Sequence, residues 1–152
     1  MRIPRYSLLF LLFTFGCSSR ILAQDNYEIQ VYASGLTELQ HTMFELHSNY
    51  TLNGSKEIQG GVFPSNHVIH ETLEITHGFS PWFEVGSYLF TSIGSDNRTA
   101  LTGVHIRPRL AIPESYHLPI GISLSTEFGY QNHDFFGGKW GAEIRPIFDR
   151  KA

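Results

Sequence analysis

The residues best suited to chemistry gather in one short stretch of the chain. It holds three histidines and two glutamates: His67, His70, Glu71, Glu74 and His77. On a helix these side chains would recur on one face, where imidazole and carboxylate groups can hold a metal ion. The spacing differs from the zinc-protease motif, which needs a histidine at position 74. A metal-binding helix is therefore one interpretation, and it would suit a periplasmic metal-dependent enzyme using His67, His70 and Glu74.

The same stretch also has the composition of a strand. Its β-branched residues are Val68, Ile69, Thr72, Ile75 and Thr76, and this residue type favours strands over helices. Successive side chains of a strand point to opposite faces. Only His70 and Glu74 would then share a face, so we predict a strand here and no metal site.

Other catalytic signals are lacking in the sequence. We find no nucleophile elbow, phosphate-binding loop or Cys/His pair. The formal net charge is -3, and the basic residues show no cluster beyond Arg107 and Arg109, whereas phosphate binding needs a basic patch. We predict a protein that is not an enzyme, with no catalytic residue, no cofactor and no nucleic-acid partner.

The elements that would position these residues are short runs of alternating apolar and polar side chains. Turn-forming residues separate the runs, as expected for strands. They cover residues 27–32, 42–52, 67–77, 82–91, 104–112, 120–131 and 140–148. We predict an all-β chain, an antiparallel up-and-down meander of about seven strands that forms part of a transmembrane β-barrel.

The connections between the runs alternate in length. Residues 78–81 and 113–119 are turn-like, whereas residues 53–66, 93–100 and 132–139 are longer and rich in Gly and Asn. Short turns at one rim and long loops at the other are typical of outer-membrane barrels, whose strands need about 9–11 residues to cross the bilayer. Charged residues make up only 16% of the chain and aromatic residues 14%, which suits a protein with apolar surface.

One face of these strands is rich in ionisable side chains. In a barrel they would point to the lumen and pair across strands, because an unpaired buried charge is costly. The predicted lumen network consists of Glu45, His47, His70, Glu74, Glu84, His105, Arg107, Arg109, Glu127, Glu143 and Arg145. In a secreted soluble β-sandwich binding module, the same alternation would leave these charges in water. The periodicity alone leaves both interpretations open.

Large aromatic residues lie near the ends of the predicted strands. They are Trp82, Tyr88, Tyr116, Tyr130 and Trp140. Such positions suit the aromatic girdles found at membrane interfaces. Ordinary core packing would explain them equally well.

The N-terminus has the features of a signal peptide. Arg2 and Arg5 precede an apolar stretch at residues 8–15, and Ala23 offers a cleavage site. We predict a signal peptide at residues 1–23, a mature β-barrel domain at residues 24–152, and export to the outer membrane of a bacterial cell. Cys17, the single cysteine, lies inside this segment, so no disulfide is expected, and lipidation of Cys17 is the alternative.

The segment from Glu71 to Gly86 resembles a hairpin of bacterial outer-membrane proteins of the phenol-degradation-pathway or transporter-like group. In that group, a strand with Glu ends in an aromatic-Gly pair, turns, and resumes with an aromatic-Glu-aliphatic run. His77 stands here where Tyr is more common, and Ser80-Pro81 replaces the usual Thr-Asp. The resemblance covers one hairpin. It implies an outer-membrane barrel with a structural or transport role, with lipid and small hydrophobic or aromatic molecules as partners, and it supplies no catalytic residue.

The last predicted strand runs almost to Ala152. Outer-membrane barrels of this kind usually end with an aromatic residue on a closing strand, and bacterial single-chain barrels have an even number of strands. We therefore expect a barrel domain that is incomplete at its C-terminus, with closure by an oligomer as the alternative.

Overall fold

The strands form one antiparallel meander. The computed structural model describes residues 32–95 and 98–150. Neighbours in sequence are neighbours in the sheet, which has the order β1-β2-β3-β4-β5-β6. The elements are β1 (Thr42–Thr51), β2 (Val68–Ser80), β3 (Phe83–Ile93), β4 (Thr99–Ala111), the 3-10 helix η1 (Glu114–Tyr116), β5 (Ile120–Gln131) and β6 (Trp140–Arg150). The predicted all-β meander is confirmed.

The described residues contain six strands rather than seven. The first predicted run falls at residues 27–32, of which only Tyr32 is described, and Tyr32 is not in a strand. The predicted signal peptide with Cys17 also lies outside the described residues. The sheet is open: β1 and β6 each pair with a single described neighbour.

Two predicted connections are shorter in the structure. β4 begins at Thr99 instead of residue 104, because Ile93 pairs with Thr99 and the Gly94 N–H donates to the Arg98 carbonyl. This tight hairpin replaces the predicted loop at residues 93–100. β2 likewise continues to Ser80, with a bulge before it, so that only Pro81 and Trp82 form the turn to β3.

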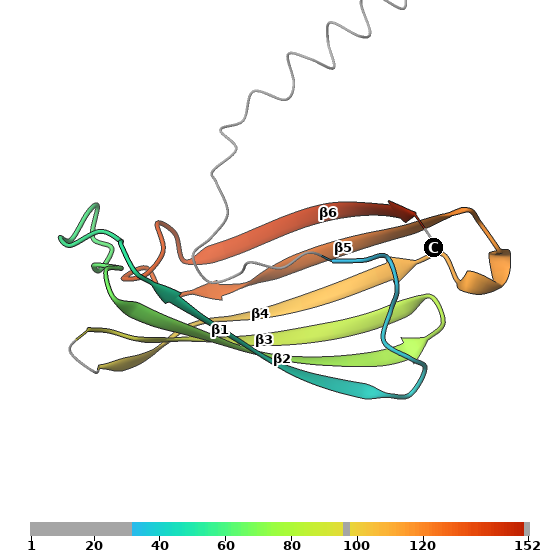
Figure 1. Ribbon diagram of the computed structural model, residues 1–152, viewed down its shortest axis with the longest axis horizontal. Helices are drawn as coiled ribbons and strands as arrows, with labels where there is room; N and C mark the ends of the chain where they lie inside the picture. The colour runs from blue at the N-terminus through green and yellow to red at the C-terminus, as the bar shows by residue number, and fades with distance from the viewer. Residues whose placement is uncertain (1–31, 96–97, 151–152) are drawn as a thin grey trace, which may run out of the picture.

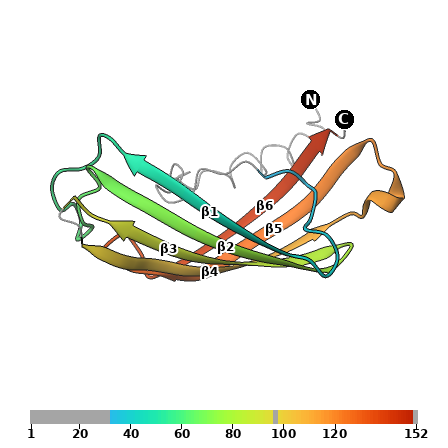
Figure 2. The same ribbon diagram turned by 60° about the horizontal axis from the view of Figure 1, so that its bottom comes forward.

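The sheet is strongly curved. Figure 1 shows the strands lying side by side, and Figure 2 shows them bent into a trough with β1 and β6 along its two rims. The connections at residues 52–67, 94–98 and 132–139 share one end of the strands, which we call the long-loop end, whereas those at residues 81–82 and 112–119 share the other, the short-turn end. The predicted difference in length is therefore kept only at residues 52–67, because residues 132–139 and 112–119 are equally long.

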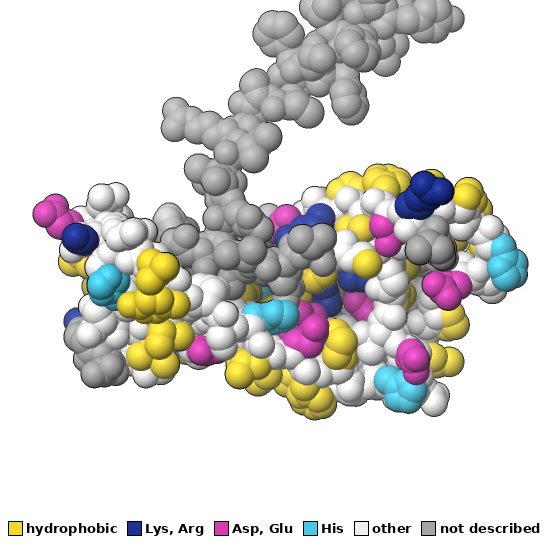
Figure 3. Space-filling model, in the orientation of Figure 1, with side chains coloured by type: hydrophobic (Ala, Val, Ile, Leu, Met, Phe, Trp, Pro, Cys, Tyr) yellow, Lys and Arg dark blue, Asp and Glu magenta, His cyan; other side chains and the backbone are white. Residues whose placement is uncertain are grey.

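Burial in this sheet is the reverse of that in a water-soluble domain. The concave face buries Glu74, Glu84, Arg107 and Arg109, whereas Phe44, Phe128, Ile144 and Phe148 on the convex face are exposed. Figure 3 shows acidic and basic side chains in the hollow of this face and hydrophobic ones near its margins. The buried hydrophobic residues of the described part are only Val68, Tyr88, Phe90, Phe136 and Ile147. Buried charge and exposed apolar surface are both informative departures from the usual distribution.

Residues 32–41, which we call the inner segment, lie against the concave face. The Thr37 N–H donates to Glu84 Oε2 at 2.6 Å, and the Ser34 N–H donates to Asp149 Oδ2 at 3.2 Å. Arg109 donates to the carbonyl oxygens of Ala33, at 2.9 Å, and Gly35. The inner segment thereby connects β3, β4 and β6, which are separate strands of the trough.

Gly78 in β2 is required for the close approach of the inner segment. Its N–H donates to the His41 carbonyl at 3.0 Å. A Cβ atom at this position would lie 2.6 Å from the Thr37 carbonyl oxygen, which is well inside van der Waals contact. Any larger residue at position 78 must therefore displace the inner segment.

We expect Gly78→Ala to speed chymotryptic cleavage after Leu36 or Leu39 about tenfold, because a loss of about 1.4 kcal/mol in docking is a tenfold change in population. Limited proteolysis of the folded chain measures the rate. Gly138→Ala is the control, since a Cβ there has no neighbour nearer than 4.0 Å. Equal cleavage rates in the two variants would contradict the docking role of Gly78.

Candidate functional site

Register across β2, β3 and β4 brings charged residues together in the floor of the trough. Thr76 pairs with Gly86, and Gly86 pairs with Arg107. Because Gly86 has no side chain, the Arg107 guanidinium can lie across β3 and reach β2. A Cβ at position 86 would lie 3.1 Å from Arg107 Nε, so this path requires glycine or a small displacement.

Arg107 is the centre of the resulting network. Its Nη2 donates to Glu74 Oε1 at 2.5 Å and to Thr76 Oγ1 at 3.2 Å, and it lies 3.5 Å from Glu84 Oε1. The guanidinium carbon also lies 4.8 Å from the Tyr32 ring centroid, which is within range of a cation–π interaction. Arg107 therefore links a β2 and a β3 carboxylate to the inner segment.

Glu84 connects Arg107 to the second arginine. Glu84 Oε1 lies 3.5 Å from Arg109 Nε as well as from Arg107 Nη2. We call Glu74, Glu84, Arg107 and Arg109 the arginine–glutamate network. All four side chains are at most 5% exposed. Charges buried this deeply are tolerated only when paired, because desolvation costs several kcal/mol per ion.

Histidines occupy the concave face at two further points. His105 Nδ1 lies 2.5 Å from Glu127 Oε1, which joins β4 to β5. His70 Nδ1 lies 3.0 Å from Ser92 Oγ, and its Nε2 lies 3.2 Å from Thr51 Oγ1. These contacts hold the histidines between strands, and they were not predictable without the register.

The remaining predicted network residues lie nearer the rims. Glu45 and His47 are in β1, where they are half-buried, and His47 Nε2 lies 3.8 Å from Glu74 Oε2. Glu143 and Arg145 in β6 form their own pair, with 2.7 Å between Oε2 and Nη2. The eleven predicted residues thus share one face of the sheet, but they divide into a central network and smaller rim groups.

The helical interpretation of residues 67–77 is wrong. His67 precedes β2 and is exposed, whereas His70 and Glu74 are buried on the concave face. Glu71 and His77 are on the convex side, where Glu71 accepts a hydrogen bond from Ser48. The β-branched residues favour a strand over a helix at these positions. The two-residue period of a strand then separates His67 from the other two suggested ligands.

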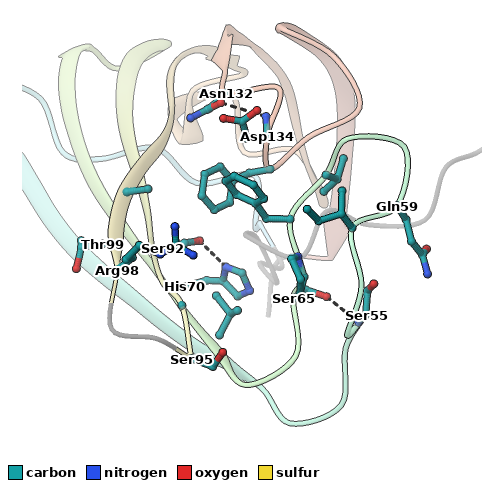
Figure 4. Close-up of a pocket in the computed structure, with 18 residues that line it drawn as sticks. Ser55, Gln59, Ser65, His70, Ser92, Ser95, Arg98, Thr99, Asn132 and Asp134 are labelled. Carbon is teal, nitrogen blue, oxygen red and sulfur yellow. Dashed lines mark hydrogen bonds between the residues drawn. The ribbon is translucent and has the colours of Figure 1, made fainter.

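A pocket lies at the long-loop end of the trough. Its volume is about 750 Å³, within the range of small-molecule sites. Figure 4 shows the hydrogen-bonded pair His70 and Ser92 facing it, with Ser55 and Ser65 on the β1–β2 loop. Its apolar lining comes from Ile58, Val62, Phe63, Pro64, Val68, Ala100 and Phe135.

Two loops are fixed to each other beside this pocket. The Phe63 N–H donates to the Asp134 carbonyl at 2.7 Å, and the Phe63 and Phe135 rings meet edge to face at 5.5 Å. Sequence reasoning missed the pocket, since its walls come from loops whose residues are distant along the chain. The Gly/Asn-rich composition indicated loops but not their contact.

The predicted aromatic girdle needs one correction. Trp82 and Tyr116 are exposed at the short-turn end, and Tyr130 and Trp140 are exposed at the long-loop end. Tyr88 instead is fully buried on the concave face, where its ring stacks on Phe90 at 5.7 Å. Tyr88 and Glu84 are four residues apart in β3, so the two-residue period of the strand places both side chains on the concave face.

Comparison of the chain with protein-family models, with curated proteins and with solved structures finds no match. Within the part that the structure describes, no helix is long and apolar enough to cross a membrane. The site must therefore be interpreted from its own chemistry.

Proposed function

We propose that this chain is part of a bacterial outer-membrane β-barrel, with a structural or small-molecule transport role and no catalysis. The observation that carries the proposal is the reversed burial of the sheet. The concave face buries three glutamates and two arginines, while the convex face exposes Phe44, Phe128 and Phe148. Lipid outside and a polar lumen inside are the surroundings that match these two faces.

The dimensions of the strands support the same proposal. The strands have 10 to 13 residues, and a tilted strand crosses the bilayer with about 9–11. Trp82 and Trp140 are exposed at opposite ends of the strands, where the two membrane interfaces would lie. Closure of the barrel requires pairing partners for β1 and β6, from further strands or from another copy of the chain.

A soluble β-sandwich is the second candidate, and the structure favours it less. A sandwich packs the apolar faces of two sheets together about 10 Å apart. The described residues form one sheet, and its apolar face is uncovered. In water, so large an apolar patch would promote association.

The pocket at the long-loop end of the trough suggests which molecules such a barrel would carry. Seven of its eighteen lining residues are apolar, and the others include Arg98, Asp134 and the hydrogen-bonded pair His70 and Ser92. Small hydrophobic or aromatic molecules that carry polar groups fit this mixed lining, because the apolar side chains supply contact area and the polar ones orient a ligand.

Cell fractionation tests the membrane proposal. In a Gram-negative host, we expect the full chain to sediment with the outer membrane and to require detergent for extraction. A variant lacking residues 1–23 should stay inside the cell, which controls for nonspecific sedimentation. A monomeric mature chain that stays dissolved without detergent would disprove the proposal.

Binding of a small aromatic probe tests the pocket. We expect Phe135→Ala to weaken binding of N-phenylnaphthylamine to the folded chain about tenfold, because losing the apolar contact of this half-buried ring costs about 1.4 kcal/mol. Fluorescence titration measures the affinity. Phe128→Ala, which removes a ring from the convex face, should leave it unchanged; a similar loss in both variants would argue against a pocket site.

A further inference from the structure

We infer that Glu45, His47 and Glu74 bind a divalent transition-metal ion, with Zn²⁺ the best match, at the β1 rim of the trough. This site differs from the histidine-rich ligand set suggested by the sequence. It goes beyond the proposed transport role and does not depend on insertion into a membrane. Three observations carry it: the convergence of the ligand atoms, an unsatisfied buried oxygen, and two carboxylates in direct register.

The three residues converge because β1 and β2 are paired. Glu45 lies directly opposite Glu74, and His47 follows two residues later on the same face of β1. One ligand atom from each lies within 4.8 Å of the other two. A tetrahedral zinc ion needs ligand atoms about 3.4 Å apart. Glu45 and His47 are half-buried on an edge strand, so side-chain rotation can close this gap.

Glu74 supplies the observation that points to a ligand. Its side chain is 1% exposed, and its Oε1 accepts from Arg107 Nη2 at 2.5 Å and Thr76 Oγ1 at 2.7 Å. Its Oε2 has no hydrogen-bond partner among the described residues, although it is buried and lies 3.8 Å from His47 Nε2. A buried, unsatisfied carboxylate oxygen is costly, and a bound cation would satisfy it.

The charges around Glu74 also favour a cation. Like charges directly opposite each other on neighbouring strands are destabilising, and Glu45 and Glu74 are such a pair. Arg107 is the nearest fixed positive charge, but Glu84 Oε1 also lies 3.5 Å from its Nη2. Arg107 therefore does not neutralise both Glu45 and Glu74, and a divalent ion would.

The ligand types select the metal. One imidazole and two carboxylates form a mixed nitrogen and oxygen set, which suits Zn²⁺ and related transition metals, whereas Ca²⁺ and Mg²⁺ prefer sites built from oxygen alone. With three protein ligands, the fourth position would hold water from the trough. The ion would join the edge strand β1 to β2.

Metal titration of the folded chain tests this site. The purified chain, in detergent where solubility demands it, is stripped with a chelator and titrated with Zn²⁺ by calorimetry. We expect one equivalent to bind, and Co²⁺ to give the visible absorption of a tetrahedral site. His47→Asn and Glu45→Gln should each weaken binding at least tenfold, whereas Ca²⁺ should bind far more weakly than Zn²⁺.

His77→Asn is the matched control. His77 belongs to the same strand pair, opposite Thr42, but lies on the convex side. It should retain wild-type affinity within about twofold. Absence of stoichiometric zinc in the wild-type chain would overturn the inference without any variant. Equal losses in His77→Asn and His47→Asn, or equal affinity for Ca²⁺ and Zn²⁺, would also overturn it.

Discussion

Replacing Arg107 with methionine is expected to lower the free energy of unfolding by about 3–5 kcal/mol, the usual cost of removing one partner from a buried ion pair. Methionine keeps most of the side-chain volume, so the loss reports charge rather than packing. Without the guanidinium, Glu74 loses its 2.5 Å contact, and Glu84 retains Arg109 at 3.5 Å and the Thr37 N–H at 2.6 Å. Urea titration of the folded chain, followed by tryptophan fluorescence, measures the change.

Two further variants separate this effect from a general loss of positive charge. Arg145→Met removes an arginine that is 30% exposed and pairs with an exposed carboxylate, so it should cost about 1 kcal/mol or less. Adding Glu74→Gln to Arg107→Met should recover part of the stability, because a neutral amide then replaces the buried carboxylate that has lost its arginine partner. If Arg145→Met were as damaging, or the double variant no better than the single, the network would not be the main source of the stabilisation.

The sequence predicted the strands well because their periodicity is local. The run at residues 120–131 matches β5 at both ends, and the start of β6 at Trp140 was also predicted. Glu71 is a charged residue among the apolar side chains on the convex side of β2, where it accepts a hydrogen bond from Ser48. A two-residue period determines the face of each side chain once the strand is identified, whatever the neighbouring strands are.

Contacts between strands were not predictable in the same way. That Arg107 would reach Glu74 depends on register and on the absence of a side chain at Gly86, and neither follows from one strand alone. The pocket depends on Phe63 and Phe135 meeting across two loops. Alternation thus identified which residues share the polar face, whereas three-dimensional pairing determined which of them form a network.

Leu124→Arg distinguishes a lipid-facing sheet from a soluble one. Leu124 is on the convex face of β5 between Leu110 and Pro146, and it is 41% exposed. An arginine on the lipid face costs about 2–4 kcal/mol near the bilayer midplane. In water, an arginine at such an exposed position would change stability by only about 0.5 kcal/mol. We therefore expect Leu124→Arg to reduce insertion into lipid vesicles strongly, measured as the protease-protected fraction.

The neighbouring position provides the control because it faces the other way. Ser125 is 2% exposed on the concave face and lies in direct register with Arg109 on one side and Arg145 on the other. An arginine there would meet two like charges, so glutamate is the informative substitution. Ser125→Glu should insert nearly as well as the wild type, since its charge is compensated. Were both variants to behave alike, the alternation of lipid and lumen along β5 would be wrong, and with it the orientation of the sheet in the bilayer.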